Sequence, residues 1–203
     1  MAEINAKVFD RFEQILLITA GIWLIIRLWP EDITYTYIDI YLLLFSESVA
    51  VLFVLLRRST QDISLRFRDW AAAITGSAGP LFVGAGGEPI AYNFGVALLF
   101  LGIIIHIAAK LSLNFSFGIV AANRGVKSSG VYYVVRHPMY LGYMLSHSGY
   151  LLAAPSWRNL AIYTIVWTAF VIRILAEERV LMKDPAYRKL AERTRWRLVP
   201  FVF

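Results

Sequence analysis

A short run of basic, aromatic and proline residues is the most distinctive chemical feature of this chain. The run reads Arg136-His137-Pro138-Met139-Tyr140-Leu141-Gly142. Pro138 suits the first turn of a helix, because its missing N–H would have no partner there. Free amides at such a helix start, together with the Arg136 guanidinium, attract anions. Tyr140 follows His137 by three residues and therefore lies on the same helical face.

A second charged cluster follows a later apolar stretch and reads Arg173-Ile-Leu-Ala-Glu177-Glu178-Arg179. Arg173 and Glu177 are four residues apart and share a helical face, whereas Glu178 lies about 100° around the helix. Such a pair can be an ordinary ion pair worth about 0.2–0.5 kcal/mol, or it can hold a ligand. Whether the two clusters form one site depends on the elements that carry them.

The composition of the chain is that of a membrane protein. Of its 203 residues, 59% are hydrophobic and only 17% are charged, and the mean hydropathy is +0.60. A lipid-exposed helix needs about 20 apolar residues, so this length admits five or six spans. The chain has no cysteine, which excludes disulfides, thiolate metal sites and cysteine nucleophiles.

We therefore expect an all-α, polytopic membrane bundle with five or six transmembrane helices. The apolar segments are 14–29, 38–56, 70–86, 89–109, 139–154 and 159–176. The third segment is the weakest, because its glycines and Pro80 favour close packing or a kink. Pro155 separates the last two segments, which predicts a tight helical hairpin. This hairpin returns Arg173 to the level of Arg136, so the two charged clusters should meet.

The basic residues predict the orientation of the bundle. The segments 1–13, 57–70, 110–138 and 173–203 together hold 18 of the 20 lysines and arginines. Cytoplasmic loops of membrane proteins are enriched in lysine and arginine. We therefore expect both termini and a charged helical tail in the cytoplasm. The net charge of +6 is thus explained by membrane orientation rather than by nucleic acid binding.

The order of these motifs resembles the isoprenylcysteine carboxyl methyltransferase family and its relatives, the membrane phospholipid N-methyltransferases. The two clusters are followed by Asp184-Pro185-Ala186-Tyr187 and Arg197-Leu198-Val199-Pro200. The resemblance covers roughly residues 110–203. The chain departs from the family at Val131, where a proline is common, and at Leu190, where a second tyrosine is common. The resemblance divides the chain into transmembrane helices, 1–109, and a cofactor-binding methyltransferase core, 110–203.

The resemblance implies that S-adenosylmethionine is the cofactor and that neither a metal nor an acid–base triad is needed. It implies cofactor-binding roles for Tyr132, Arg136, His137, Tyr140, Gly142 and Glu178, and catalytic roles for Arg173 and Glu177. Arg136 or the helix amides would take the cofactor carboxylate, and Glu177 or Glu178 its hydroxyl and amino groups. Tyr132 or the apolar rim would take its adenine. Arg173 is the candidate for an acceptor carboxylate, because its planar fork grips carboxylates.

The lipophilic acceptor implied by the family is most consistent with the carboxylate of an isoprenylcysteine-like substrate, and a phospholipid amine is the second hypothesis. A membrane reductase that uses NADPH and a non-enzymatic lipid-binding protein are further alternatives.

Several of these residues also have simple structural interpretations. Arg136 and His137 can be interfacial anchors of a helix end. Glu47 and His106 lie inside apolar segments, where structural hydrogen bonding is favoured over a role in an acceptor tunnel. The glycines at 84–87 do not follow a strand, so they indicate an outer turn rather than a dinucleotide site.

Overall fold

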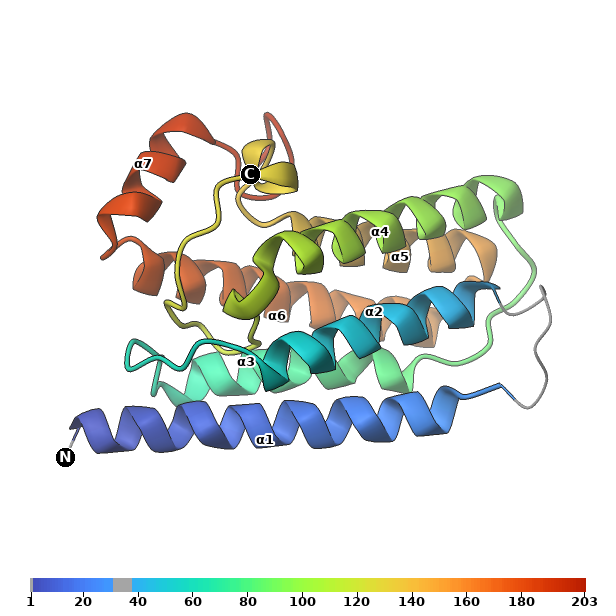
Figure 1. The fold of residues 1–203 in the computed structure, drawn as a ribbon. Helices are drawn as coiled ribbons and strands as arrows, with labels where there is room; N and C mark the ends of the chain where they lie inside the picture. Colours follow the sequence, from blue (N-terminus) through green and yellow to red (C-terminus); the bar gives the residue numbers. More distant parts are fainter. Residues whose placement is uncertain (1, 31–37) are drawn as a thin grey trace.

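A computed structural model of the chain describes residues 2–30 and 38–203. Within these residues the structure is all-α and has seven α-helices (Figure 1). They are α1 (Ala2–Leu28), α2 (Ile38–Leu55), α3 (Phe67–Ala78), α4 (Tyr92–Leu113), α5 (Pro138–Ala153), α6 (Trp157–Leu181) and α7 (Pro185–Arg193). Short 3₁₀ turns occur at Gly79–Phe82, Asn114–Ser116 and Gly130–Tyr133. The predicted all-α fold is confirmed.

Two helical stretches in the described part of the chain are long and apolar enough to cross a membrane. They are Tyr92–Ser116 and Trp157–Leu181. The apolar part of α2, Tyr41–Leu55, is shorter. The predicted count of five or six crossings stays a prediction. Residues 31–37, between the first two predicted apolar segments, lie outside the described residues.

The third predicted segment, 70–86, does not form one helix of that length. Helix α3 ends at Ala78, and a 3₁₀ turn that contains Pro80 follows it. Its 12 residues span about 18 Å, well short of a bilayer core of about 30 Å. The short helix packs on α6, where a Cβ added at Gly76 would lie 3.1 Å from the Phe170 ring. The glycines and proline of this segment thus serve close packing and a helix end.

Helices α4 and α5 pack with their backbones in contact. A Cβ at Gly102 would lie 2.5 Å from the carbonyl oxygen of Gly142, and one at Gly142 would lie 2.7 Å from that of Gly102. About two helical turns further along each helix, a Cβ at Gly149 would lie 2.5 Å from the carbonyl oxygen of Gly95. Small residues allow this approach, which is a common way for membrane helices to associate. Gly142, predicted to contact the cofactor, therefore lies in the α4–α5 interface.

The predicted hairpin of the last two apolar segments is present, with α5 ending at Ala153 and α6 beginning at Trp157. Aromatic side chains fill its interface. The ring centroids of His147 and Tyr163 lie 4.2 Å apart, and Trp167 Nε1 donates to His147 Nδ1 at 3.3 Å. The hairpin brings the end of α6 back to the start of α5.

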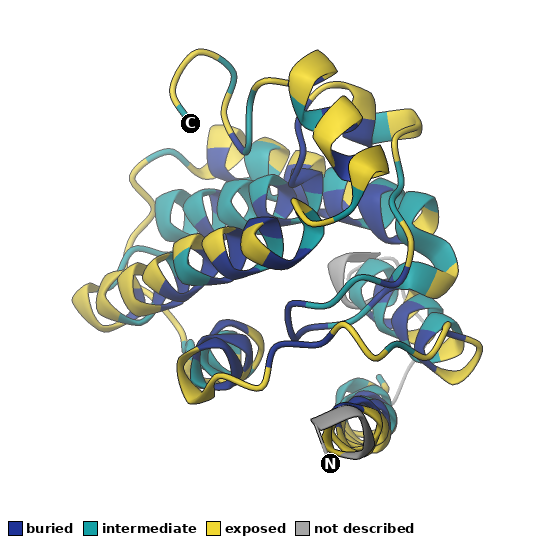
Figure 2. Cartoon of the chain, turned by 90° about the vertical axis from the view of Figure 1, so that its left-hand side faces the viewer, coloured by how far each residue is buried: buried dark blue, intermediate teal, exposed yellow. Residues whose placement is uncertain are grey.

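The connections that carry the charged motifs gather at one end of the bundle. The loop 114–137, helix α7 and the start of α3 lie at the same end as the N-terminus of α1, on the left of Figure 1. Figure 2 views the molecule from this end and shows buried segments of the loop beneath α7 and the tail. This end holds most of the basic residues and is the one that we expect in the cytoplasm.

We predict that reporter fusions at residues 62 and 125 are cytoplasmic and that a fusion at residue 87 is external. The reason is the concentration of lysine and arginine at one end of the bundle. Reporter enzymes that are active on only one side of the membrane would measure this. A cytoplasmic signal at residue 87 would contradict a crossing by α3 and the turn that follows it.

Candidate functional site

The carboxylate of Glu178 lies at the centre of a buried polar cluster. Its oxygens lie 3.2 Å from Arg136 Nη2, 3.4 Å from His137 Nε2 and 2.8 Å from Arg197 Nε. The hydroxyl of Tyr187 donates to the same carboxylate at 3.3 Å. Glu178 is thus fully partnered, and it ties α6 to the turn before α5, to α7 and to the C-terminal tail.

The neighbouring carboxylate, Glu177, contacts the other side of the His137 imidazole. Its Oε2 lies 3.4 Å from His137 Nδ1, and the hydroxyl of Tyr140 donates to its Oε1. His137 therefore lies between Glu177 and Glu178. Burial lowers the pKa of His137, but hydrogen bonds and the charges of both glutamates outweigh burial and raise it above its usual value. The raised pKa favours the protonated imidazole, which then bridges the two carboxylates.

Backbone pairing fixes the turn that carries Arg136 and His137. The Arg136 amide donates to the Trp196 carbonyl at 3.0 Å, and the His137 amide donates to the Arg197 carbonyl at 2.8 Å. Helix α5 begins at Pro138, as the sequence predicts. The Arg136 charge is paired with Glu178, and its predicted role toward the cofactor carboxylate stays a prediction.

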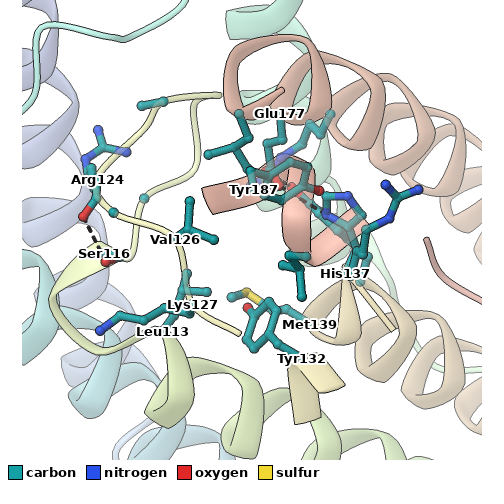
Figure 3. A pocket seen from close by; sticks show the side chains of 18 of the residues that line it. Leu113, Ser116, Arg124, Val126, Lys127, Tyr132, His137, Met139, Glu177 and Tyr187 are labelled. Carbon is teal, nitrogen blue, oxygen red and sulfur yellow. Dashed lines mark hydrogen bonds and ion pairs between the residues drawn. The ribbon is translucent and has the colours of Figure 1, made fainter. Parts of the chain in front are cut away.

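A pocket lies next to this cluster (Figure 3). Its walls come from the loop 116–127, the 3₁₀ turn before α5, the ends of α4 and α6, and α7. Six predicted site residues line it, namely Tyr132, Arg136, His137, Tyr140, Arg173 and Glu177. Glu178 lies behind this lining, and Gly142 lies in the helix interface. The two sequence clusters therefore meet, as the hairpin predicts.

Burial gives Tyr132 a neutral phenol at the pocket wall. The pKa of Tyr132 is raised well above its usual value, first by burial and then by the negative charge of Glu177. Tyr187, on the α7 side of the pocket, also has a raised pKa, again mainly because it is buried. Both tyrosines therefore act as hydrogen-bonding or stacking groups rather than as anions.

Arg173 is a buried cation with weak polar partners. Its Nη1 donates to Ser77 Oγ at a long 3.4 Å, and its Cζ lies 5.1 Å from the centroid of the Tyr140 ring. Its Nε is buried and has no hydrogen-bond partner in the described part of the chain. The alternative of a simple Arg173–Glu177 ion pair is not formed among the described residues. A buried guanidinium so placed favours an anion in the pocket.

Several pocket residues carry no sequence motif and were not predicted. They include Ser116, Gly118, Arg124, Val126 and Lys127. Lys127 makes no hydrogen bond or ion pair within the described residues. The Ser116 hydroxyl donates to the Arg124 carbonyl at 2.9 Å, which closes the loop on itself (Figure 3). The only sequence signal for these residues is that they belong to 110–138, a long connection between apolar segments that we expect on the cytoplasmic side.

Glu47 and His106 lie away from this pocket and serve a buried polar network. Lys110 Nζ lies 2.9 Å from Glu47 Oε1, and Ser46 Oγ lies 3.0 Å from His106 Nε2. The His106 ring packs 4.7 Å from that of Tyr143. These contacts favour the structural interpretation of both residues.

Residues 90–189 match the family model of the phospholipid methyltransferases. This stretch contains α4 to α6, the first part of α7 and every predicted site residue. Over these residues the chain is similar to the phospholipid methyltransferases. It is a methyltransferase of the membrane, and its methyl donor is S-adenosylmethionine. The predicted enzyme class and cofactor are confirmed, and the reductase and non-enzymatic alternatives lose their support. No curated protein and no solved structure matches the chain.

We predict that His137 stabilises the fold at low pH and that this contribution fades as the pH rises. Because the folded-state pKa is raised, the contribution is complete below the unfolded pKa of about 6.5 and is lost above the folded pKa. Thermal unfolding in detergent should show the largest difference between the wild type and His137→Gln near pH 6, and a smaller one near pH 9. A difference that does not change with pH would contradict the cationic bridge.

Proposed function

We propose that this methyltransferase acts on a lipophilic acceptor with a carboxylate, as in an isoprenylcysteine-like substrate. The observation that carries the proposal is Arg173, a buried cation with an unpartnered Nε in the same pocket as His137 and Glu177. A carboxylate matches the planar donors of arginine with two parallel hydrogen bonds. On the orientation that the basic residues predict, the pocket and both termini face the cytoplasm. The acceptor would enter the pocket from the bilayer.

The pocket residues suit S-adenosylmethionine, which supplies an activated methyl group on a positively charged sulfur when it is bound. Lys127 is a cation without a partner among the described residues, so we assign it to the cofactor carboxylate. Glu177 is the acceptor of hydrogen bonds from hydroxyl or amino groups. Tyr132 offers a neutral aromatic face for the adenine. His137 and Tyr140 complete this wall.

The other predicted residues act by holding this pocket in shape. Glu178 and Arg136 fix the imidazole of His137 through their ion pair and the contacts of Glu178. Gly142 allows the close approach of α4 and α5, and this approach sets the position of Met139 at the pocket floor. Positioning and exclusion of water are what a methyl transfer to a carboxylate needs from a protein.

Arg173 lies at the depth that suits a lipid-borne group. It is one helical turn from Glu177 along α6, which corresponds to about 6 Å. On the proposed orientation this places Arg173 on the bilayer side of the pocket. An arginine at such a depth is costly unless it has a counter-ion, and an acceptor carboxylate would supply one.

A phospholipid amine is the second candidate acceptor. The matching family model is that of phospholipid methyltransferases, and the Glu177 carboxylate in the pocket would attract an ammonium group. An amine must lose a proton before it is methylated, whereas a carboxylate at neutral pH need not. The two candidates therefore make opposite demands on Arg173, which would repel the ammonium form.

Titration calorimetry and acceptor assays test this function directly. The purified protein should bind S-adenosylhomocysteine saturably and should not bind NADPH. In the presence of S-adenosylmethionine it should methylate an S-farnesyl thioether carboxylic acid faster than phosphatidylethanolamine in vesicles. Preferential methylation of the amine would overturn the carboxylate proposal and leave the enzyme class intact.

We predict that His137→Ala weakens binding of S-adenosylhomocysteine while the bundle stays folded. The change removes a pocket wall and leaves Glu177 and Glu178 facing each other without the cation between them. His106→Ala is the matched control, because it removes a buried histidine outside the pocket. Calorimetry on both variants measures the effect. Unchanged affinity in a folded His137→Ala protein would return His137 to the role of a helix anchor.

We predict that Arg173→Lys lowers turnover strongly and leaves cofactor affinity within a few-fold. Lysine keeps the charge but loses the fork that binds a carboxylate with two hydrogen bonds. Arg179→Lys is the control on the same helix, because Arg179 pairs with Asp69 at 3.1 Å, away from the pocket. Rates with the farnesyl acid and calorimetry give the two quantities. Equal losses in turnover and cofactor binding would show that Arg173 belongs to the cofactor site.

A further inference from the structure

Four charged side chains form a buried cluster at the N-terminal end of α1. Asp10 and Glu13 come from α1, Arg57 follows α2, and Arg124 comes from the loop after α4. Arg57 lies 2.9 Å from Asp10 and 3.0 Å from Glu13. Arg124 lies 2.7 Å from Asp10 and 2.6 Å from Glu13. The negative charges of the two carboxylates balance the positive charges of the two guanidiniums. All four side chains are at most 2% exposed.

One carboxylate of this cluster also binds the backbone of the pocket loop. Glu13 Oε1 accepts hydrogen bonds from the amides of Ile119 at 2.7 Å and Val120 at 2.8 Å. Its Oε2 accepts from the two arginines. Gly118 has no room for a side chain, since a Cβ there would lie 2.4 Å from Arg124 Nη1 and 3.1 Å from Glu13 Oε1.

The loop held by Glu13 is a wall of the pocket. Gly118, Val120, Ala122 and Arg124 line the pocket, and Arg124 is seen at its edge in Figure 3. Arg124 belongs both to the charged cluster and to the pocket wall, so the cluster and the pocket share this loop. A shift of the loop by the loss of Glu13 would change the width of the pocket.

The far edge of the same loop is held by the connection between α2 and α3. The amide of Ser64 donates to the carbonyl of Ala121 at 2.8 Å, and the amide of Asn123 donates to that of Asp62 at 2.9 Å. Thr60 Oγ1 donates to the Asn123 carbonyl at 2.7 Å. These bonds fix residues 121–123. Glu13 alone holds the amides of 119 and 120 among the described residues.

We infer that Glu13 is a positioning residue for the methyl donor, acting through the loop 118–124. The inference rests on the proposed location of the cofactor in this pocket. It makes α1, which lies outside the family match at residues 90–189, a working part of the donor site. The inference thus adds a residue of the predicted segment 1–109 to the support of the pocket in the predicted core, 110–203.

The chemistry of the cluster explains why a carboxylate is needed at this position. Glutamine would keep one oxygen for the two amides, but its NH₂ group would face the donors of Arg57 and Arg124. Two guanidiniums would then share the single carboxylate of Asp10, which leaves an uncompensated buried charge. The loop amides or the arginines must move to relieve this conflict.

The test compares Glu13→Gln with Gly21→Ala in the full chain. A Cβ at Gly21 would lie 2.4 Å from Val51 Cγ2, so Gly21→Ala disturbs the packing of α1 on α2 without touching the loop. Thermal unfolding without ligand measures how far each change weakens the fold. Titration with S-adenosylhomocysteine should show a loss of about tenfold or more for Glu13→Gln, the size expected for a lost buried hydrogen-bond acceptor, and under threefold for Gly21→Ala.

Equal losses of affinity in the two variants, or no loss in a folded Glu13→Gln protein, would overturn the inference. Hydrogen exchange on the wild type tests it without any variant. Peptides that cover residues 117–121 should already be protected in the ligand-free protein, and rapid exchange there would also overturn it. Binding of S-adenosylhomocysteine to the wild type and to His137→Ala distinguishes failure of the Glu13 inference from failure of the proposed function. If the wild type does not bind, or if His137→Ala binds as well as the wild type, the assignment of the cofactor to this pocket fails.

Discussion

The buried carboxylate of Glu178 is the interaction on which the rest of this site depends. Its partners come from the turn before α5, from α7 and from the C-terminal tail, so a single group joins segments that are distant in sequence. A buried carboxylate is tolerated because every side of it meets a donor. Without Glu178, the charges of Arg136 and His137 would lose their shared partner. The turn before α5 would then lose its fixed orientation.

Close helix contact supplies the rigid support for this cluster. Gly102 and Gly142 bring α4 and α5 together at the level of their backbones, which places the end of α4 beside the start of α5. The pocket is then lined by Leu113 from one helix and Met139 from the other. The polar cluster sets the chemistry of the site, and the glycine contacts set its dimensions.

The sequence predicts the meeting of the two charged clusters because helical spacing and a proline-separated hairpin are local signals. Those signals lead from Arg136 and His137 to Glu177 without any knowledge of the loops. They do not find Lys127 or the ion pairs of Arg124, because an irregular loop has no period and its contacts reach residues of α1 that are far away in the chain. Gly142 illustrates a further limit, since a glycine within a motif can serve helix packing rather than a ligand.

The pairing of Arg136 and His137 with the carbonyls of Trp196 and Arg197 has a consequence for biosynthesis. Chains fold progressively as they leave the ribosome, so α4 and α5 can insert and associate before the tail exists. The turn before α5 cannot pair with the C-terminal tail until residues 196–198 have emerged from the ribosome. Until then the amides of Arg136 and His137 lack their partners in the tail, so the helical scaffold can form before the site is complete.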